Sequence, residues 1–151
     1  ERHGVYTEKE LLARAEVSYE QYAKSINIEA LTMIVMASRD YIPAVENYVA
    51  QIADSAAKKL AVCPDVSCAV EKDIIRRLSE LNAKAYSTVE RLREVETEAA
   101  SVQSARDRAE CYCSRVLPLM SELREAVDAM EQLTSSKSWP VPTYGDMMFR
   151  V

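Results

Sequence analysis

Apolar residues recur at alternating spacings of three and four along most of this chain, a pattern typical of helices that pack along their length. The longest such pattern lies between Ile26 and Ile52. Its predicted seam, meaning the stripe that faces a partner helix, is Ile28, Leu31, Val35, Ser38, Ile42, Val45, Val49 and Ile52. Further apolar side chains widen the first half beyond one stripe, so the pattern predicts a central helix enclosed by neighbours.

The same reasoning predicts two further long helices and a shorter first helix. The third helix has the seam Ile74, Leu78, Leu81, Ala85, Thr88, Leu92, Val95 and Ala99. The fourth has the seam Ala105, Ala109, Tyr112, Val116, Leu119, Leu123, Ala126 and Met130. Thr7 and Glu10 have the spacing of a capping box, which predicts an N-terminal helix over 7–25. The predicted fold is all-α: an elongated antiparallel three-helix bundle over 27–134, preceded by this helix. No glycine or proline forces a break between them, so a helix continuous through 25–27 stays open.

Proline and capping residues predict the interruptions in these helices. Pro43 and Pro118 stand inside helical patterns, and each is expected to kink its helix, because proline removes a hydrogen bond and clashes with the preceding turn. Pro64 is expected to end the central helix, with Asp65 or Ser67 capping the next one. Ser104, followed three residues later by an aspartate, predicts a further helix start and a turn within 97–104.

The C-terminal segment 135–151 differs in character from the rest. Two prolines predict an extended tail that cannot continue the helix. We predict that it docks through Trp139, Pro140, Pro142, Tyr144, Met147, Met148 and Phe149. A solvated tail rarely carries so much apolar surface, so we expect it to contact this bundle, a further domain or a neighbouring subunit.

Composition narrows the classes of function. The 151 residues are 48% hydrophobic and 28% charged, which suits a single domain with its own core. Only two glycines occur, which disfavours the tight turns of sheet proteins. The net charge of -5 and the dispersed lysines and arginines argue against nucleic-acid binding. No apolar run is long enough to span a membrane, and the single histidine excludes a Ser-His-Asp set.

The cysteines do not have the spacing of a metal site. Cys63 and Cys68 flank one predicted turn, while Cys111 and Cys113 lie near the start of the fourth helix. Neither pair has the usual zinc-ligand spacing, so we expect reduced, unmetallated thiols. Oxidation of the first pair to a disulfide stays open. We predict no catalytic, cofactor-binding or metal-binding residue in this chain.

Three ordered stretches resemble one enzyme family. The ending WPVPTYGDMMF, after a helix reading LMSELREAVDAMEQL, resembles the extreme C-terminus of type III glutamine synthetases. The stretch YAKSINIEALTMIVMASRDYIPAVENY and the opening ERHGVYTEKELLARAEV resemble the helical region before it. The chain also begins without an initiator methionine, so we expect 1–151 to be a C-terminal helical domain of a larger enzyme.

The resemblance implies a glutamate–ammonia ligase of nitrogen metabolism, using ATP and magnesium or manganese. It implies a cytoplasmic homo-oligomer whose catalytic residues lie on an upstream domain, with that domain and neighbouring subunits as the partners of this chain. The chain alone is then non-catalytic, without cofactors, and stabilises the oligomer. The alternative is a stand-alone helical interaction module with no enzymatic parent.

Overall fold

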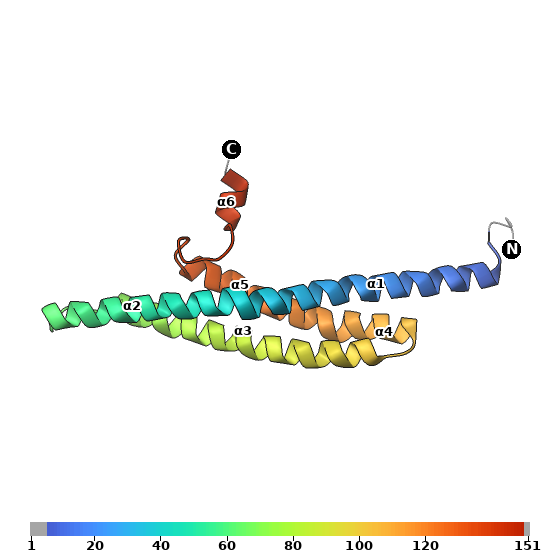
Figure 1. Cartoon of the computed structure of the whole chain (residues 1–151), viewed down its shortest axis with the longest axis horizontal. Helices are drawn as coiled ribbons and strands as arrows, with labels where there is room; N and C mark the ends of the chain where they lie inside the picture. Colours follow the sequence, from blue (N-terminus) through green and yellow to red (C-terminus); the bar gives the residue numbers. More distant parts are fainter. Residues whose placement is uncertain (1–5, 150–151) are drawn as a thin grey trace. The chain divides into compact units, whose positions relative to one another are not determined.

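The structure is a computed structural model that describes residues 6–149, and Figure 1 shows helices joined by short connections. In chain order, with η denoting π-helix, the elements are α1 (Glu8–Met36), η1 (Ala37–Tyr41), α2 (Ile42–Val62), α3 (Ala69–Ser101), α4 (Ala105–Cys111), η2 (Tyr112–Val116), α5 (Leu117–Leu133) and α6 (Tyr144–Phe149). Within 6–149 there is no strand. The predicted all-α fold of a helical bundle is confirmed.

The chain divides into two compact units, each made from segments that are distant in sequence. The first unit combines Glu1–Ile34 with Arg91–Ser121, and the second combines Val35–Glu90 with Glu122–Val151. Each unit therefore depends on contacts between early and late parts of the chain.

The N-terminal helix begins where its capping box predicts. The backbone amide and the hydroxyl of Thr7 donate to the Glu10 carboxylate at 2.8 and 2.9 Å, and the Glu10 amide donates back to the Thr7 hydroxyl at 3.3 Å. Of the two possibilities left open at 25–27, a break or a continuous helix, the structure shows the continuous helix, because α1 runs through to Met36 and the N-terminal helix does not end at 25. Asn27 does not cap a new helix there; its side chain is used in contacts with other helices.

The later helix ends also agree with their local signals. α2 ends at Val62, two residues before Pro64. The Ser67 hydroxyl accepts from the amide of Ala69, the first residue of α3, at 3.4 Å. α3 ends at Ser101, and the Ser104 hydroxyl caps α4 by accepting from the Asp107 amide at 3.4 Å. The turn predicted within 97–104 is confirmed and comprises residues 102–104.

Both internal prolines come after a π-helical segment at the same distance. η1 ends at Tyr41, two residues before Pro43, and η2 ends at Val116, two residues before Pro118. A π turn widens the helix, which relieves the clash between a proline ring and the preceding turn. The helices continue past both prolines, and π turns are a recognised cause of bends. The kinks predicted at these two positions stay predictions, but the irregular backbone lies where they were expected.

Burial confirms the predicted seam of the fourth helix, agrees in part with that of α3 and shifts that of the central helix. Every predicted seam residue of the fourth helix, from Ala105 to Met130, is buried. In α3 the predicted positions are buried or half-buried. In the first half of the central helix, Ile28, Leu31 and Val35 are 65%, 44% and 47% exposed. The buried side chains there are Ala23, Ile26, Ala30, Ile34 and Ala37.

The tail is not extended throughout. Residues Tyr144–Phe149 form the short helix α6, which corrects the extended structure predicted over 135–151. A capping box between Thr143 and Asp146, which was not predicted, explains it. The Thr143 amide and hydroxyl donate to the Asp146 carboxylate at 3.1 and 2.9 Å, and the Asp146 amide donates to the Thr143 hydroxyl at 3.2 Å. Pro142 lies just outside this box and is compatible with a helix that starts after it.

Candidate functional site

The predicted docking residues of the tail divide into two groups. Trp139 is 7% exposed, and its ring stacks on Tyr41 with centroids 5.2 Å apart and planes 13° apart. Pro140 and Pro142 are exposed, and Met147 and Met148 are 64% and 73% exposed. The side chains of Tyr144 and Phe149 lie outside what the structure describes. The tail is thus attached within its own unit through Trp139, whereas its methionines face outward.

A buried polar cluster joins three helical segments of the first unit. The Asn27 side-chain amide donates to Glu96 Oε1 at 2.5 Å and to the Tyr112 hydroxyl at 2.8 Å. The Tyr112 hydroxyl donates in turn to Glu96 Oε1 at 3.5 Å. Tyr112 is 2% exposed and is the first residue of η2. One carboxylate oxygen therefore receives two donors at the point where the helix widens.

Electrostatics keep the phenol of this cluster protonated. Burial raises the pKa of Tyr112 most strongly, the hydrogen bond from Asn27 lowers it, and the negative charge and hydrogen bond of Glu96 raise it further. The net pKa lies above the ordinary value of 10.0. At neutral pH Tyr112 is therefore a hydrogen-bond donor and cannot act as a base.

A pocket of about 430 Å³ lies beside the cluster. Its lining residues are Ala23, Lys24, Asn27, Ile28, Ala100, Arg108 and Tyr112. Its two cations already have partners: Lys24 pairs with Glu20 at 3.4 Å, and Arg108 donates to the Val102 carbonyl at 3.3 Å. The pocket offers polar contacts but no activated nucleophile, so its chemistry is that of packing or weak binding.

A second asparagine contacts the start of α2, directly after the other π-helical segment. Asn82 is 9% exposed, and its side-chain amide donates to the Ile42 carbonyl and to Glu46 Oε2, both at 3.4 Å. Ile42 lies between η1 and Pro43. Asn82 Oδ1 is buried without a hydrogen-bond partner. An asparagine from another helix therefore contacts the first residue of η2 in one case and the residue that follows η1 in the other.

These polar contacts were not among the predictions, although the sequence carries a signal for them. The buried residues of α3 include Leu78, Asn82, Ala85, Val89, Leu92, Glu96 and Ala99, at alternating spacings of four and three. Asn82 and Glu96 are therefore polar residues at seam positions. A polar side chain at such a position often specifies how helices pair.

The cysteines are free thiols in different surroundings. Cys63 is exposed, while Cys68 is buried with its sulfur 3.9 Å from the Ala56 carbonyl oxygen. Arg115 lies 4.0 Å from the sulfur of Cys111. The hydrogen bond with Cys113 is the main cause that raises the pKa of Tyr22. Among residues 6–149, no three histidine, cysteine or acidic side chains gather where they could hold a metal ion.

The connection between α2 and α3 carries a charged pair. Lys59 in the last turn of α2 pairs with Glu71 in the first turn of α3. The hydrogen bond raises the pKa of Lys59 and lowers the pKa of Glu71. An open hollow of about 590 Å³ lies beside it. The hollow is lined by Gln51, Asp54, Ser55, Lys58, Lys59, Val62, Cys63 and Val66.

No helix in the described part of the chain combines the length and the apolar character that crossing a membrane needs.

Comparison with known proteins adds a family relationship. Residues 1–60 match the family model "Glutamine synthetase C-terminal domain". A glutamine synthetase of Butyrivibrio fibrisolvens is 33% identical over 148 residues, which is 98% of this chain and 21% of that protein. The glutamine synthetase of Bacteroides fragilis (strain YCH46) is 22% identical over 149 residues, covering 96% of this chain and 20% of the relative. The type-3 glutamine synthetase of Dictyostelium discoideum is 26% identical over 151 residues, covering 93% and 20%. The chain spans about a fifth of the length of these relatives.

Proposed function

We propose that this chain, which belongs to the glutamine synthetase family, is the helical C-terminal region of a larger glutamate–ammonia ligase. The observation that carries the proposal is the similarity over 98% of this chain to only 21% of a glutamine synthetase. The match of residues 1–60 to the C-terminal domain model supports the same assignment.

The whole enzyme would join ammonia to glutamate with ATP and a divalent metal, magnesium or manganese, in the cytoplasm. We place the ATP, the metal and the catalytic residues outside this chain. Residues 6–149 offer no cluster of metal ligands, and the buried polar groups of the first unit already bind one another. The chain then contributes structure to the enzyme and no reacting group.

Its partners, on this proposal, are the upstream catalytic domain and neighbouring subunits of a homo-oligomer. Two surfaces support this role because the described fold leaves them uncovered. Met147 and Met148 protrude from α6, and Ile28, Leu31 and Val35 form one exposed face of α1. Apolar patches of this kind commonly mark interaction sites.

The test compares the isolated chain with the longer enzyme that contains it. We expect the longer enzyme to form glutamine from glutamate, ammonia and ATP. We expect the isolated chain to show neither turnover nor retention of ATP in equilibrium dialysis. Turnover by the isolated chain would refute its non-catalytic role, and a longer protein without synthetase activity would refute the enzymatic assignment.

The structural role has a separate readout in the longer enzyme. Replacing Met147 and Met148 together by serine should leave the catalytic groups intact, raise the share of smaller species in sedimentation and lower the temperature of inactivation. Lys137→Ala, in the exposed turn at the start of the tail, is the matched control. Identical sedimentation and heat stability of the serine variant would show that this surface holds no partner.

A further inference from the structure

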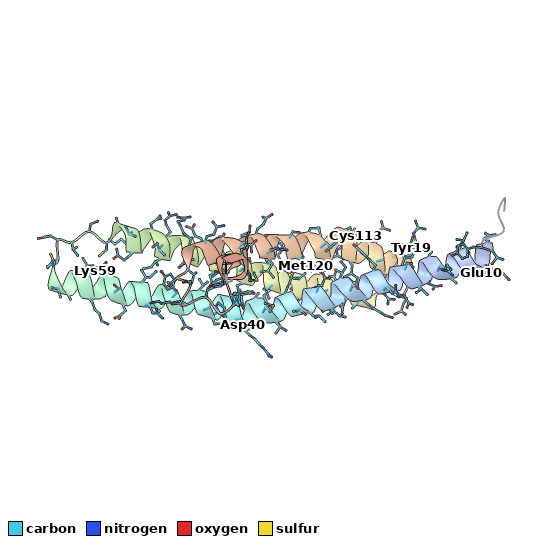
Figure 2. The ribbon with its side chains drawn as sticks, turned by 90° about the horizontal axis from the view of Figure 1, so that it is seen from above. Glu10, Tyr19, Asp40, Lys59, Cys113 and Met120 are labelled. Atoms are coloured by element: carbon cyan, nitrogen blue, oxygen red, sulfur yellow. The ribbon has the colours of Figure 1, made fainter. Side chains whose placement is uncertain are left out.

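The first turns of α1 form a stretch of helix that no other described segment covers. Every residue from 8 to 19 is exposed, whereas Ala23 and Ile26, further along the same helix, are 2% and 8% exposed. In Figure 1 this end of α1 runs past the turn between α3 and α4, and in Figure 2 Glu10 lies on it with no other helix alongside. We call residues 8–19, about three turns of helix, the overhang.

One side of the overhang is apolar and leads into the packed face of the same helix. The side chains of this stripe are Leu11, Leu12, Ala15 and Tyr19. From Leu12 the stripe keeps spacings of three and four, which lead on to Tyr22 and Ile26. Tyr22 already has a partner in the first unit, the thiol of Cys113, whose hydrogen bond raises the pKa of the phenol. The stripe is therefore the packing face of α1, carried beyond the partners that the first unit supplies.

The overhang has its own start signal but lacks a packing partner. The capping box between Thr7 and Glu10 fixes its first turn. Leu11 and Leu12 are nevertheless 54% and 64% exposed, and Tyr19 is 39% exposed. A helix of this length without packing is marginal in water, because packing of an apolar face supplies most helical stability in proteins. The described part of the chain does not supply the packing to which the stripe is suited.

We propose that the overhang docks, through this stripe, on the part of the same polypeptide that precedes residue 1 in the longer enzyme. The inference rests on the proposed function, which places this chain at the C-terminal end of a larger protein. The match to one relative spans 21% of that protein, so most of the relative lies outside the match. The overhang itself lies within residues 1–60, which match the C-terminal domain model. Most of the longer chain therefore comes before the overhang.

Chain connectivity favours this occupant over a separate molecule. The overhang starts at residue 8, and even a fully extended stretch of seven residues spans at most about 25 Å. The preceding part of the enzyme is therefore held beside the stripe at an effective concentration on the order of millimolar. A second copy or another protein has to reach the same surface from solution, at its own much lower concentration.

The stripe also indicates the chemistry of the surface that covers it. Leu11, Leu12 and Tyr19 require an apolar counterpart, because their exposed apolar area is stabilising only when it leaves water. Glu8 precedes the two leucines by three and four residues and therefore lies on the same face, at the end nearest to residue 1. We expect an apolar groove with a basic side chain at the end that meets Glu8.

Hydrogen exchange followed by mass spectrometry tests whether the overhang is covered. The amides of residues 12–19 exchange through local opening of the helix end, so their rate reports its packing. We expect this exchange to be slower in the longer enzyme than in the isolated chain by at least about tenfold, the factor that corresponds to burial of one leucine side chain. Equal rates in the two proteins would overturn the proposal.

Site-specific photocrosslinking in the longer enzyme identifies the occupant. The variant Leu12→p-benzoylphenylalanine places the reactive group on the stripe. Ala13→p-benzoylphenylalanine is the control, because Ala13 is exposed and points away from the stripe. Irradiation should join position 12, and not position 13, to a segment that precedes residue 1, in a product with the mass of a single chain. A product with the mass of two chains, a crosslink within residues 1–151, or equal yields at the two positions would refute docking within the same polypeptide.

Synthetase activity of the longer protein separates this inference from the one on which it rests. An active synthetase whose overhang exchanges as fast as in the isolated chain would refute the docking alone. In a longer protein without synthetase activity the proposed function fails, while the same exchange and crosslinking results still decide the docking.

Discussion

The stacked pair of Trp139 and Tyr41 allows the attachment of the tail to be measured. Trp139 is 7% exposed and lies in the irregular segment between α5 and α6, so its buried indole anchors this segment. Trp→Ala in a well-packed site costs about 3–5 kcal/mol. The irregular segment around Trp139 can close over the space that the indole leaves. We therefore expect a loss of stability at the lower end of this range, about 3 kcal/mol. Of this, about 1 kcal/mol belongs to the aromatic pair.

Urea unfolding followed by far-ultraviolet circular dichroism gives the change in the free energy of unfolding. A double-mutant cycle with Trp139→Ala, Tyr41→Ala and the combined variant isolates the pair, with an expected coupling of about 1 kcal/mol. Tyr86→Ala is the control, because Tyr86 is 60% exposed and should change stability by less than about 0.5 kcal/mol. A loss no larger than that control, or a coupling of zero, would refute the view that the stack holds the tail.

Two further predictions concern pH. The pKa of Tyr112 is raised in the folded state, so its contribution to stability is complete below the ordinary value of 10.0 and is lost as pH rises through the folded value. Tyr112→Phe should cost about 1.5 kcal/mol at neutral pH and flatten the alkaline decline measured by thermal unfolding; an unchanged decline would contradict the burial argument. The pKa of Glu71 is lowered by Lys59, so its contribution is present above the ordinary value of 4.5 and is lost as pH falls through the folded value. Glu71→Gln should therefore show a weaker acid dependence of the melting temperature than the parent chain, and equal slopes would count against the pair.

The fourth predicted helix could be recognised from the sequence because its pattern of apolar residues coincides with the face that is buried. The predicted seam residues from Ala105 to Met130 follow a strict seven-residue pattern, and every one of them is buried. The helix starts at Thr7 and Ser104 were equally readable, because a capping box is a local interaction that needs no knowledge of distant contacts. The box at Thr143 and Asp146 has the same form, and the two prolines before it concealed it.

The polar contacts could not be recovered because apolar neighbours offered an alternative pattern. In α3, Leu81 and Val95 continue the seven-residue period as well as Asn82 and Glu96 do, and hydrophobicity alone favours the former. The structure turns the helix by one residue, so that Asn82 and Glu96 are buried and the two apolar residues are half-buried. The partners of these two polar residues decide the rotation of the helix. Asn82 contacts Ile42 and Glu46. Glu96 contacts Asn27 and Tyr112, and none of these partners lies on α3.

The first half of the central helix shows why apolar strength is a poor guide to which face is buried. Its buried positions run Ala23, Ile26, Ala30, Ile34, Ala37, with spacings of three, four, four and three, whereas the predicted seam assumed a strict period of seven. Three of these are alanines, which add little to a hydrophobic pattern but permit close approach of a neighbouring helix. The strict pattern instead selects Ile28, Leu31 and Val35, which are exposed. The two patterns meet again at Val45, after η1, because a π turn accommodates an extra residue and rotates the next stretch of helix. The most apolar face of the helix is therefore the one that residues 6–149 leave uncovered, which is the arrangement expected of a surface that a larger assembly covers.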